Sequence, residues 1–378
     1  MHSTFLRKEH IHGVMLGIAI GDALGLAREG LCRRVALRMH GRGPLSYRLI
    51  RGKGVYSDDT QLVMINAQAL LKSRSDAKSF RRIFQSRLKW YPLSLPFWAG
   101  KATLFAAAKC WLRPLGLASG VKSAGNGAAS RAVFTALAIH GTGHRLSRWV
   151  EESTKLTHSH PLAIDGCQVL AALAEYGANC KHGKFSHSEA LEVAIAASSQ
   201  AEIKDKLIEL AGFLNARRGP SSVARYFNWR CGITGTMVPT TIMATYCFLR
   251  YPNDFRRAVE SAVLLGGDSD SVAAVVGGLV GALNGANKIP DDLIKNLSGY
   301  PQGVAWIEKM ADRMSHWPHG MDDLHFAPAQ PSDPLAQLLR NSLTIPIVLL
   351  HILRRLPYRS CTRCQSKAPR RRQRRARK

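Results

Sequence analysis

Acidic residues are scarce in this sequence, and patterns typical of β-strands are scarcer still. The 378 residues include 26 Asp and Glu against 53 Lys and Arg, which gives a formal net charge of +27. Few stretches alternate apolar and polar residues, whereas apolar residues recur at spacings of three and four along most of the chain. The sequence therefore predicts an all-α protein. We expect helices at 11–27, 59–73, 76–90, 128–140, 162–178, 188–199, 202–214, 236–250, 254–265, 271–286 and 302–315.

The sequence also lacks paired cysteines, a signal peptide and a long apolar run. The one CxxC, Cys361 to Cys364, has no second pair at zinc spacing, so it is weak evidence for metal or redox chemistry. The apolar run after His12 is interrupted by Asp22, and the apolar stretch 343–353 is too short to span a bilayer. These absences predict a reducing, cytoplasmic setting. The cysteines are scattered over positions 32, 110, 167, 180, 231, 247, 361 and 364.

The end of the chain differs from the rest in composition. Pro328, Pro331 and Pro334 indicate a linker, so we expect a folded domain over 1–328 and a basic, flexible tail over 329–378. Residues 354–378 contain twelve basic side chains and no acid.

Such a charge favours polyanions, either nucleic acid or an anionic membrane, although a merely solubilising tail is an equal interpretation. Residues 366–378 contain no aromatic residue, so no platform for base stacking is visible there.

Two short acidic runs stand out against this basic background. Asp58 and Asp59 lie at the start of one predicted helix, and Asp268 and Asp270 lie at the start of another that is wholly apolar. Capping explains a single Asp or Ser at a helix N-terminus. Doubled carboxylates with hydroxyls beside them are better explained as hard oxygen ligands, for which Mg²⁺ is the first candidate and Mn²⁺ or Ca²⁺ are rivals.

Glycines recur every four residues in the first and late helices. Gly13, Gly17, Gly21 and Gly25 form one bare stripe, and 277, 281 and 285 form another. Each interior glycine costs roughly 0.5–1 kcal/mol relative to alanine, so these stripes predict a close approach of two helix backbones.

Five blocks of sequence, in the same order, resemble the ADP-ribosylglycohydrolase family, which includes the dinitrogenase reductase-activating glycohydrolases. They are the segment 22–29 with Asp22 and Glu29, the two acidic runs, the glycine-rich 123–131 and the histidine segment 157–161. The resemblance implies a compact orthogonal helical bundle around a two-magnesium cleft. It also implies hydrolysis of the glycosidic bond that joins ADP-ribose to a target, most simply a protein side chain.

The resemblance assigns roles residue by residue. Glu29 and Asp58 are the candidates for acid–base work, and the sequence does not separate them; the resemblance also leaves metal binding open as the role of Glu29. The substrate-binding set would be Asp22, Gly125, Asn126, Gly127 and His158. The alternative function is a non-catalytic ADP-ribose-binding protein with the same pocket. The predicted metal ligands are Ser57, Asp58, Asp59, Asp268, Asp270 and Ser271.

Overall fold

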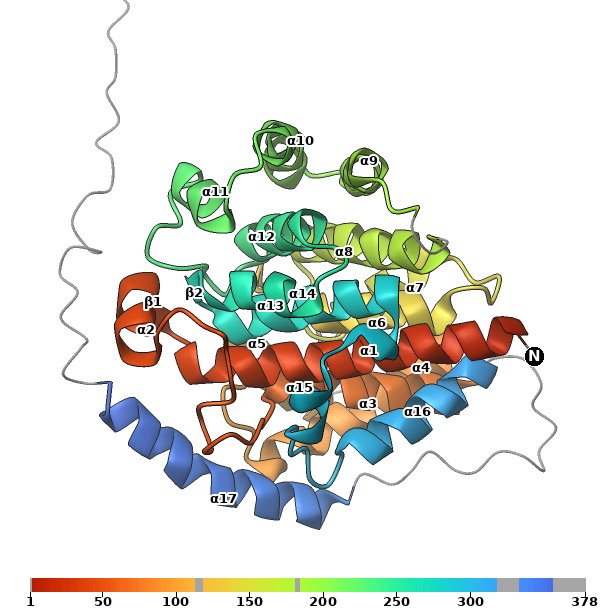
Figure 1. Cartoon of the computed structure of the whole chain (residues 1–378). Helices are drawn as coiled ribbons and strands as arrows, with labels where there is room; N and C mark the ends of the chain where they lie inside the picture. Colours follow the sequence, from red (N-terminus) through yellow and green to blue (C-terminus); the bar gives the residue numbers. More distant parts are fainter. Residues whose placement is uncertain (1, 113–117, 181–183, 318–332, 356–378) are drawn as a thin grey trace, which may run out of the picture.

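The structure is a computed structural model that describes residues 2–112, 118–180, 184–317 and 333–355. Helices dominate these residues and pack across one another in several layers (Figure 1), which confirms the predicted all-α class. The helices of the first half are α1 His2–Gly25, α2 Arg33–His40, α3 Asp58–Ser73, α4 Ala77–Trp90, α5 Lys101–Trp111, α6 Ala129–Ile139, α7 Leu146–Lys155 and α8 Pro161–Asn179. Those of the second half are α9 His187–Ala197, α10 Ala201–Asn215, α11 Pro220–Tyr226, α12 Met237–Arg250, α13 Phe255–Val263, α14 Ser269–Asn284, α15 Asp291–Lys295, α16 Val304–His316 and α17 Pro334–Leu353.

Short elements join these helices. The 3-10 turns are η1 Leu26–Arg28, η2 Tyr91–Ser94 and η4 Ala286–Lys288. Among the described residues the named strands are β1 Leu31–Cys32 and β2 Gly266–Gly267, which pair antiparallel with Leu31 opposite Gly267. This small pairing ties the segment after Glu29 to the segment before Asp268.

The centre of the bundle is the pair α1 and α14, which run antiparallel in contact. A Cβ on Gly17 would clash with the carbonyl of Gly277, and a Cβ on Gly277 would clash with the carbonyl of Gly17. Gly13 and Gly281 stand in the same relation one turn away. The predicted close approach of the two helix backbones is thus confirmed. Because the helices are antiparallel, the end of α1 lies against the beginning of α14.

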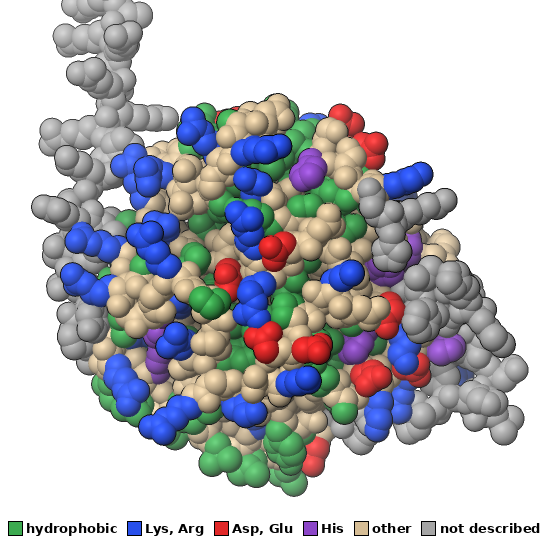
Figure 2. Space-filling model, viewed as in Figure 1, with side chains coloured by type: hydrophobic (Ala, Val, Ile, Leu, Met, Phe, Trp, Pro, Cys, Tyr) green, Lys and Arg blue, Asp and Glu red, His purple; other side chains and the backbone are tan. Residues whose placement is uncertain are grey.

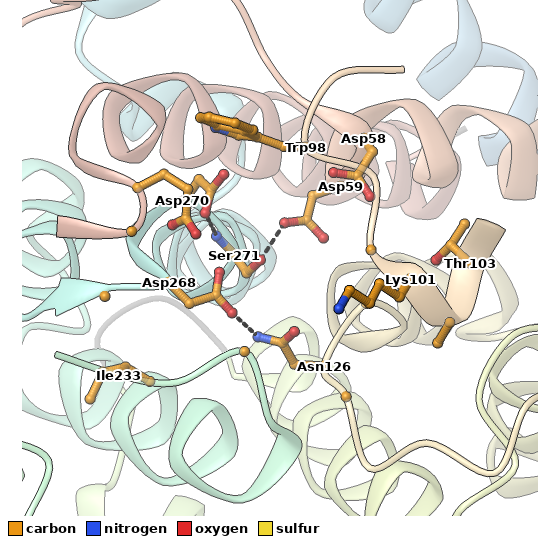
Figure 3. A pocket seen from close by; sticks show the side chains of 18 of the residues that line it. Asp58, Asp59, Trp98, Lys101, Thr103, Asn126, Ile233, Asp268, Asp270 and Ser271 are labelled. Carbon is orange, nitrogen blue, oxygen red and sulfur yellow. Dashed lines mark hydrogen bonds between the residues drawn. The ribbon is translucent and has the colours of Figure 1, made fainter. Parts of the chain in front are cut away.

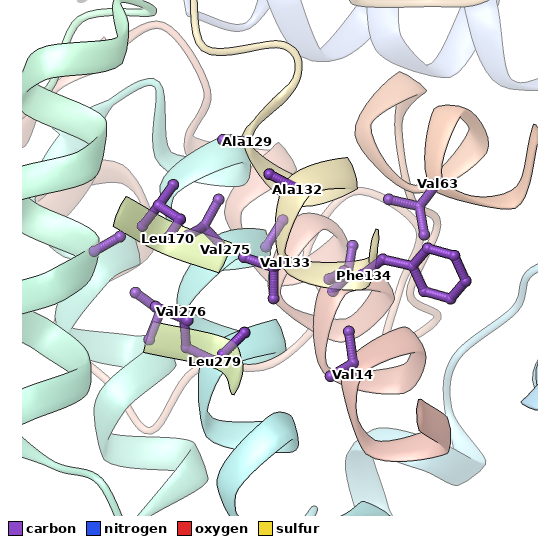
Figure 4. Close-up of a cluster of buried hydrophobic side chains, with 14 of the residues drawn as sticks. Val14, Val63, Ala129, Ala132, Val133, Phe134, Leu170, Val275, Val276 and Leu279 are labelled. Carbon is purple, nitrogen blue, oxygen red and sulfur yellow. The ribbon is translucent and has the colours of Figure 1, made fainter. Parts of the chain in front are cut away.

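Apolar side chains from several helices fill the space around this pair. Figure 4 shows Val14 of α1, Val63 of α3, Phe134 of α6, Leu170 of α8 and Val276 of α14 in one cluster. All five are at most 1% exposed. The core therefore holds the ends of α1, α3, α6 and α14 in fixed relative positions.

Helix α17 is where the structure departs from the sequence prediction. Residues 334–353 were expected to belong to a flexible tail, yet they form a helix along one side of the body (Figure 1). Asp333 caps it by accepting from the N–H groups of residues 335 and 336, and Pro334 occupies the first turn, where a missing N–H costs nothing. The predicted boundary at 328, and residues 356–378, lie outside the described residues.

Two described helices are long and apolar enough to cross a membrane by length and composition alone. One spans 7–28 and is mostly buried within the bundle, as a core helix is expected to be. The other is α17, of which only 28% is buried. The apolar stretch 343–353 alone is too short to span a bilayer, but α17 as a whole, with 20 residues, is longer than that stretch.

Candidate functional site

A cavity of about 730 Å³ opens where the beginnings of α3 and α14 meet the segment after α1. Figure 3 shows carboxylates from these separate segments pointing toward a common centre. The acidic residues that line it are Glu29, Asp58, Asp59, Asp268 and Asp270. Residues more than two hundred positions apart therefore share one cavity, and in particular Asp58 and Asp270 face the same space.

The first acidic run forms the N-terminus of α3. Ser57 is the N-cap residue, and its Oγ accepts a hydrogen bond from the N–H of Asp59 at 3.4 Å. This capping role is the simpler of the two explanations for Ser57, which is fully buried and is not among the residues that line the cavity. Asp58 and Asp59 follow it and do line the cavity.

Asp22 lies behind this turn and not in the cavity. Its carboxylate accepts from the N–H of Ser57 at 2.9 Å and from the hydroxyl of Thr60 at 2.6 Å, and it is 0% exposed. The expectation that Asp22 faces the substrate is corrected accordingly, because its oxygens are already engaged by the start of α3. Its role in this structure is to hold the first acidic run in place.

The second acidic run forms the N-terminus of α14. Gly266 and Gly267 both have positive φ angles, of 74° and 77°, which an L-residue with a side chain rarely adopts. After this turn the N–H of Asp268 donates to the carbonyl of Ile233 at 2.8 Å. Asp268 stands at the N-cap position but makes no side-chain cap. Its carboxylate is therefore directed to the cavity, which favours the ligand interpretation over capping.

Direct hydrogen bonds connect the acidic segments. The hydroxyl of Ser271 donates to Asp59 at 2.7 Å, and the N–H of Ser269 donates to Glu29 at 2.9 Å. Glu29, Asp268 and Asp270 can each bring one oxygen within 4.8 Å of the others. This cluster could hold a metal ion, since cavity-facing carboxylate oxygens are the ligands that hard divalent cations prefer.

The carboxylates repel one another, and this repulsion adds to the effect of burial on their pKa values. Burial raises the pKa of Glu29 to about 7, and the neighbouring Asp268 adds to the shift. Burial, then Asp59 and Asp22, raise the pKa of Asp58 well above its usual range. The pKa values of Asp59 and Asp270 are likewise raised, first by burial and then by neighbouring carboxylates. A bound cation would relieve this repulsion, so the donor set fits a divalent metal.

The glycine-rich loop forms the opposite wall. Gly125, Asn126 and Gly127 all line the cavity. A Cβ on Gly125 would come within 3.2 Å of the His158 ring, so the bare loop packs closely on that imidazole. Asn126 donates from Nδ2 to Asp268 at 2.5 Å and to the Thr240 hydroxyl at 2.8 Å. The loop is thereby joined to the second acidic run.

His158 lines the cavity as a neutral ring. Burial and the nearby Arg131 guanidinium lower the pKa of His158 to about 3. Its Nδ1 lies 2.8 Å from the hydroxyl of Thr157, which also accepts from Arg131. An imidazole without charge can offer one N–H to a ligand and adds no positive charge to the cavity.

Several lining residues were not among those predicted from the sequence. Trp98 and Lys101 enter from the segment before and at the start of α5, and the Lys101 amine points toward the carboxylates (Figure 3). Ile352 and Arg355 enter from the end of α17. Arg355 donates to the backbone carbonyls of Glu29 and Ala27. In the sequence Arg355 is one of many basic residues near the C-terminus, and that pattern does not predict its contact with the segment of Glu29.

Comparison with known proteins agrees with this geometry. The model of the ADP-ribosylglycohydrolase family matches residues 3–322. The chain is 28% identical to the ADP-ribosylarginine hydrolase Tri1 of Pseudomonas putida, over 82% of this chain and 79% of that protein. It is 24% identical to the ADP-ribosyl-[dinitrogen reductase] glycohydrolase of Rhodospirillum rubrum, over 75% and 89% respectively.

Among solved structures, an ADP-ribosylglycohydrolase-related protein complex aligns with a TM-score of 0.62 at 25% identity. The alignment covers 82% of this chain and 98% of that one. The matched family region ends before α17 begins, so the helix that carries Ile352 and Arg355 is an addition to the part of the fold that the family model describes. The family match spans most of the sequence and includes both acidic runs: this chain is a hydrolase of the ADP-ribosylglycohydrolase family.

Proposed function

We propose that the protein is a Mg²⁺-dependent hydrolase that removes ADP-ribose from a modified protein side chain. The observation that carries the proposal is the convergence of Glu29, Asp58, Asp59, Asp268 and Asp270 on one cavity. Lys101 and Arg355 also line it, which leaves an excess of three negative charges if all the carboxylates are ionised. Two divalent cations would turn this into a small positive excess, which suits the diphosphate of ADP-ribose.

The chain's own residues supply distinct parts of the chemistry. Asp59, Asp268 and Asp270 would hold the cations, with Ser271 as a hydroxyl ligand beside them. Bound Mg²⁺ would supply Lewis acidity toward the ribose hydroxyls and toward a water. Hydrolysis adds water to the anomeric carbon and gives a proton to the leaving group. Glu29 and Asp58 remain the two candidates to move those protons, since both carboxylates face the cavity.

The remaining walls fit the rest of the substrate. The loop 125–127 brings two glycines, Gly125 and Gly127, to the cavity wall just before α6 begins, and their bare backbone suits a diphosphate. Trp98 offers an aromatic face at the cavity wall, and neutral His158 offers a hydrogen bond. Arginine is the acceptor to test first, because the named hydrolase from Pseudomonas putida acts on ADP-ribosylarginine.

The test is release of free ADP-ribose from defined conjugates on arginine, serine and nucleic acid, with and without Mg²⁺. Asp268→Asn keeps the side-chain volume and removes one charge from the cluster, so we expect turnover to fall by at least about 100-fold. Asp291→Asn, on the exposed side of α15, is the matched control and should retain full activity.

A chain that binds ADP-ribose tightly in calorimetry but releases no product from any conjugate would instead be a non-catalytic binding protein. Among the described residues, the six cysteines form no disulfide with one another. The cytoplasmic compartment stays a proposal, and protein localisation in cells would test it.

A further inference from the structure

Helix α17 buries several polar side chains against the protein beside a small apolar contact at Val348, and it turns a row of leucines to solvent. Arg340 donates to the carbonyl of Tyr56, and its guanidinium lies 4.5 Å from the Tyr56 ring and 5.3 Å from the Phe97 ring. Asn341 is 0% exposed and donates to the carbonyl of Ser94 at 2.6 Å. An ordinary surface helix turns its apolar residues to the core and its polar residues to water, whereas α17 buries Arg340 and Asn341 and exposes leucines.

The opposite side of α17, called here its outer face, is a row of exposed leucines. They recur at helical spacing over the whole length of the helix, so they lie along one side. Their exposed fractions are 76% for Leu335, 55% for Leu339, 64% for Leu343, 54% for Leu349, 49% for Leu350 and 57% for Leu353. Figure 2 shows hydrophobic side chains gathered at the lower edge of the molecule, where α17 lies in Figure 1, with Lys and Arg side chains close by.

A groove beside the first turns of α17 continues this apolar surface. It has a volume of about 940 Å³ and is lined by Leu335 together with Trp90 and Leu93 from the end of α4 and from η2. Its charged lining residues among those described are all basic: Lys72, Arg82 and Arg87. Trp90 is 52% exposed, and its ring contacts the half-exposed Trp111 with centroids 4.6 Å apart. Exposed tryptophans beside cations are typical of surfaces that meet a lipid headgroup layer.

The positive charge of the sequence after α17 favours one kind of binding partner for the outer face over the others. Residues 354–378 contain twelve basic side chains and no acid. A second copy of this chain would bring another net charge of +27 to the same interface, which opposes association. Nucleic acid would satisfy the basic residues but would leave the leucines in water. An anionic bilayer offers both a negative surface and an apolar layer beneath it.

We propose that the outer face of α17 docks this protein on an anionic phospholipid surface. The leucines enter the boundary between headgroups and acyl chains, while the groove cations Lys72, Arg82 and Arg87 face the headgroups. The helix lies on the bilayer and does not cross it, because crossing would take Arg340 and Asn341 out of their buried contacts and into lipid. The proposal does not depend on the hydrolase activity.

Flotation of the full chain with vesicles tests the proposal. The vesicles are made of phosphatidylcholine alone or of phosphatidylcholine with phosphatidylserine, at low and high salt. We expect flotation with the anionic vesicles at low salt, weaker flotation at high salt, and none with the neutral vesicles. Replacing three outer-face leucines, Leu339→Glu, Leu343→Glu and Leu350→Glu, should lower the vesicle partition coefficient by more than about tenfold.

The matched control carries the same charge change on a distant surface. Ala201→Glu, Ile208→Glu and Ala211→Glu are exposed positions on α10, which lies on the other side of the molecule in Figure 1. This triple variant should float like the parent chain. The leucine variant should keep the parent's melting temperature and circular dichroism, because its altered side chains point away from the body.

Four results of the binding experiments would overturn the proposal, and a fifth comes from carbonate extraction. The four are no flotation with anionic vesicles at low salt, equal flotation of the leucine variant, binding to nucleic acid with none to vesicles, and a dimer that the leucine variant dissolves without any vesicle binding. Resistance of the bound protein to alkaline carbonate would mean that α17 spans the bilayer, which also contradicts docking on its surface.

Discussion

Two of the helices that bring residues to the cleft, α14 and α17, are attached to the body in contrasting ways. Helix α14 is buried almost throughout and touches α1 backbone to backbone, through glycines. Helix α17 is attached by the polar side chains Arg340 and Asn341 and by a small apolar cluster at Val348, and it leaves a row of leucines in water. The contact of α14 with α1 leaves no room for an added side chain, whereas the contact of α17 with the body depends largely on a few hydrogen bonds.

The two helices contribute to the cleft in different ways. The α1–α14 contact fixes the position of the carboxylates, since Glu29 follows the end of α1 and Asp268 and Asp270 stand at the start of α14. Helix α17 adds a wall to the same cleft through Ile352 and Arg355. Damage to the first contact should therefore destroy the fold, whereas damage to the second should loosen one helix and reduce activity.

The largest effect is expected at the glycine contact. Gly277→Val places side-chain atoms where the carbonyl of Gly17 lies, and neither backbone can move aside inside a packed core. We expect a loss of at least about 3 kcal/mol in the free energy of unfolding, or insoluble protein. Urea unfolding measures it. The control is Gly212→Ala on α10, where a Cβ meets nothing within 4 Å and should stabilise by roughly 0.5–1 kcal/mol.

A smaller, local effect is expected at α17. Arg340→Ala removes the hydrogen bond to Tyr56 and the stacking on two aromatic rings, at a cost of about 1.5–3 kcal/mol. Hydrogen exchange should rise across 334–353 while amides of α1 and α14 keep their protection. Exposed Arg354→Ala is the control. Equal loss of protection in α1 would show that the two attachments are not independent.

The sequence predicted the helices whose limits are locally encoded. The expected helices at 59–73 and 236–250 agree closely with α3 and α12, because each is periodic and Pro239 of α12 lies in the first turn, where a missing N–H costs nothing. Helix α17 was missed because its buried side mixes polar and apolar residues while its exposed side is rich in leucine, so its pattern resembles neither a core helix nor a solvated one. Pro346 inside the helix added to the misinterpretation.

The candidate site was predictable in part for a similar reason. Doubled carboxylates at two helix starts are unusual enough to indicate a shared site without knowledge of the fold. The position of Asp22 behind α3, and of Arg355 in the cleft, depends on how distant elements pack. No local pattern distinguishes a carboxylate that holds a backbone turn from one that faces a cavity, so Asp22 was assigned to the substrate.

Arg355 gives the next prediction, because it lies where the two regions meet. Arg355→Ala removes two donors to the carbonyls of Glu29 and Ala27, so the segment that carries Glu29 gains freedom. We expect kcat to fall about 5–30-fold, which corresponds to 1–2 kcal/mol, with little change in the melting temperature. Product-release kinetics measure this. An unchanged kcat would show that α17 covers the cleft without positioning Glu29.

The pH dependence of stability gives the smallest effect and tests the α1–α14 end of the cleft alone. The pKa of Glu29 is raised from 4.5 to about 7, first by burial and then by Asp268, so the folded metal-free protein binds this proton more tightly than the unfolded chain does. The stabilisation is complete below pH 4.5 and is lost as the pH rises through about 7. The melting temperature of the metal-free protein should fall over this window, and the fall should be weaker in Glu29→Gln and in excess Mg²⁺.

Arg354→Ala, on exposed α17 surface, should retain the parent's slope. An equal slope in Glu29→Gln would mean that the other carboxylates of the cluster account for the whole pH dependence of the melting temperature. Glu29 would then lie farther from those carboxylates than its hydrogen bond to Ser269 indicates.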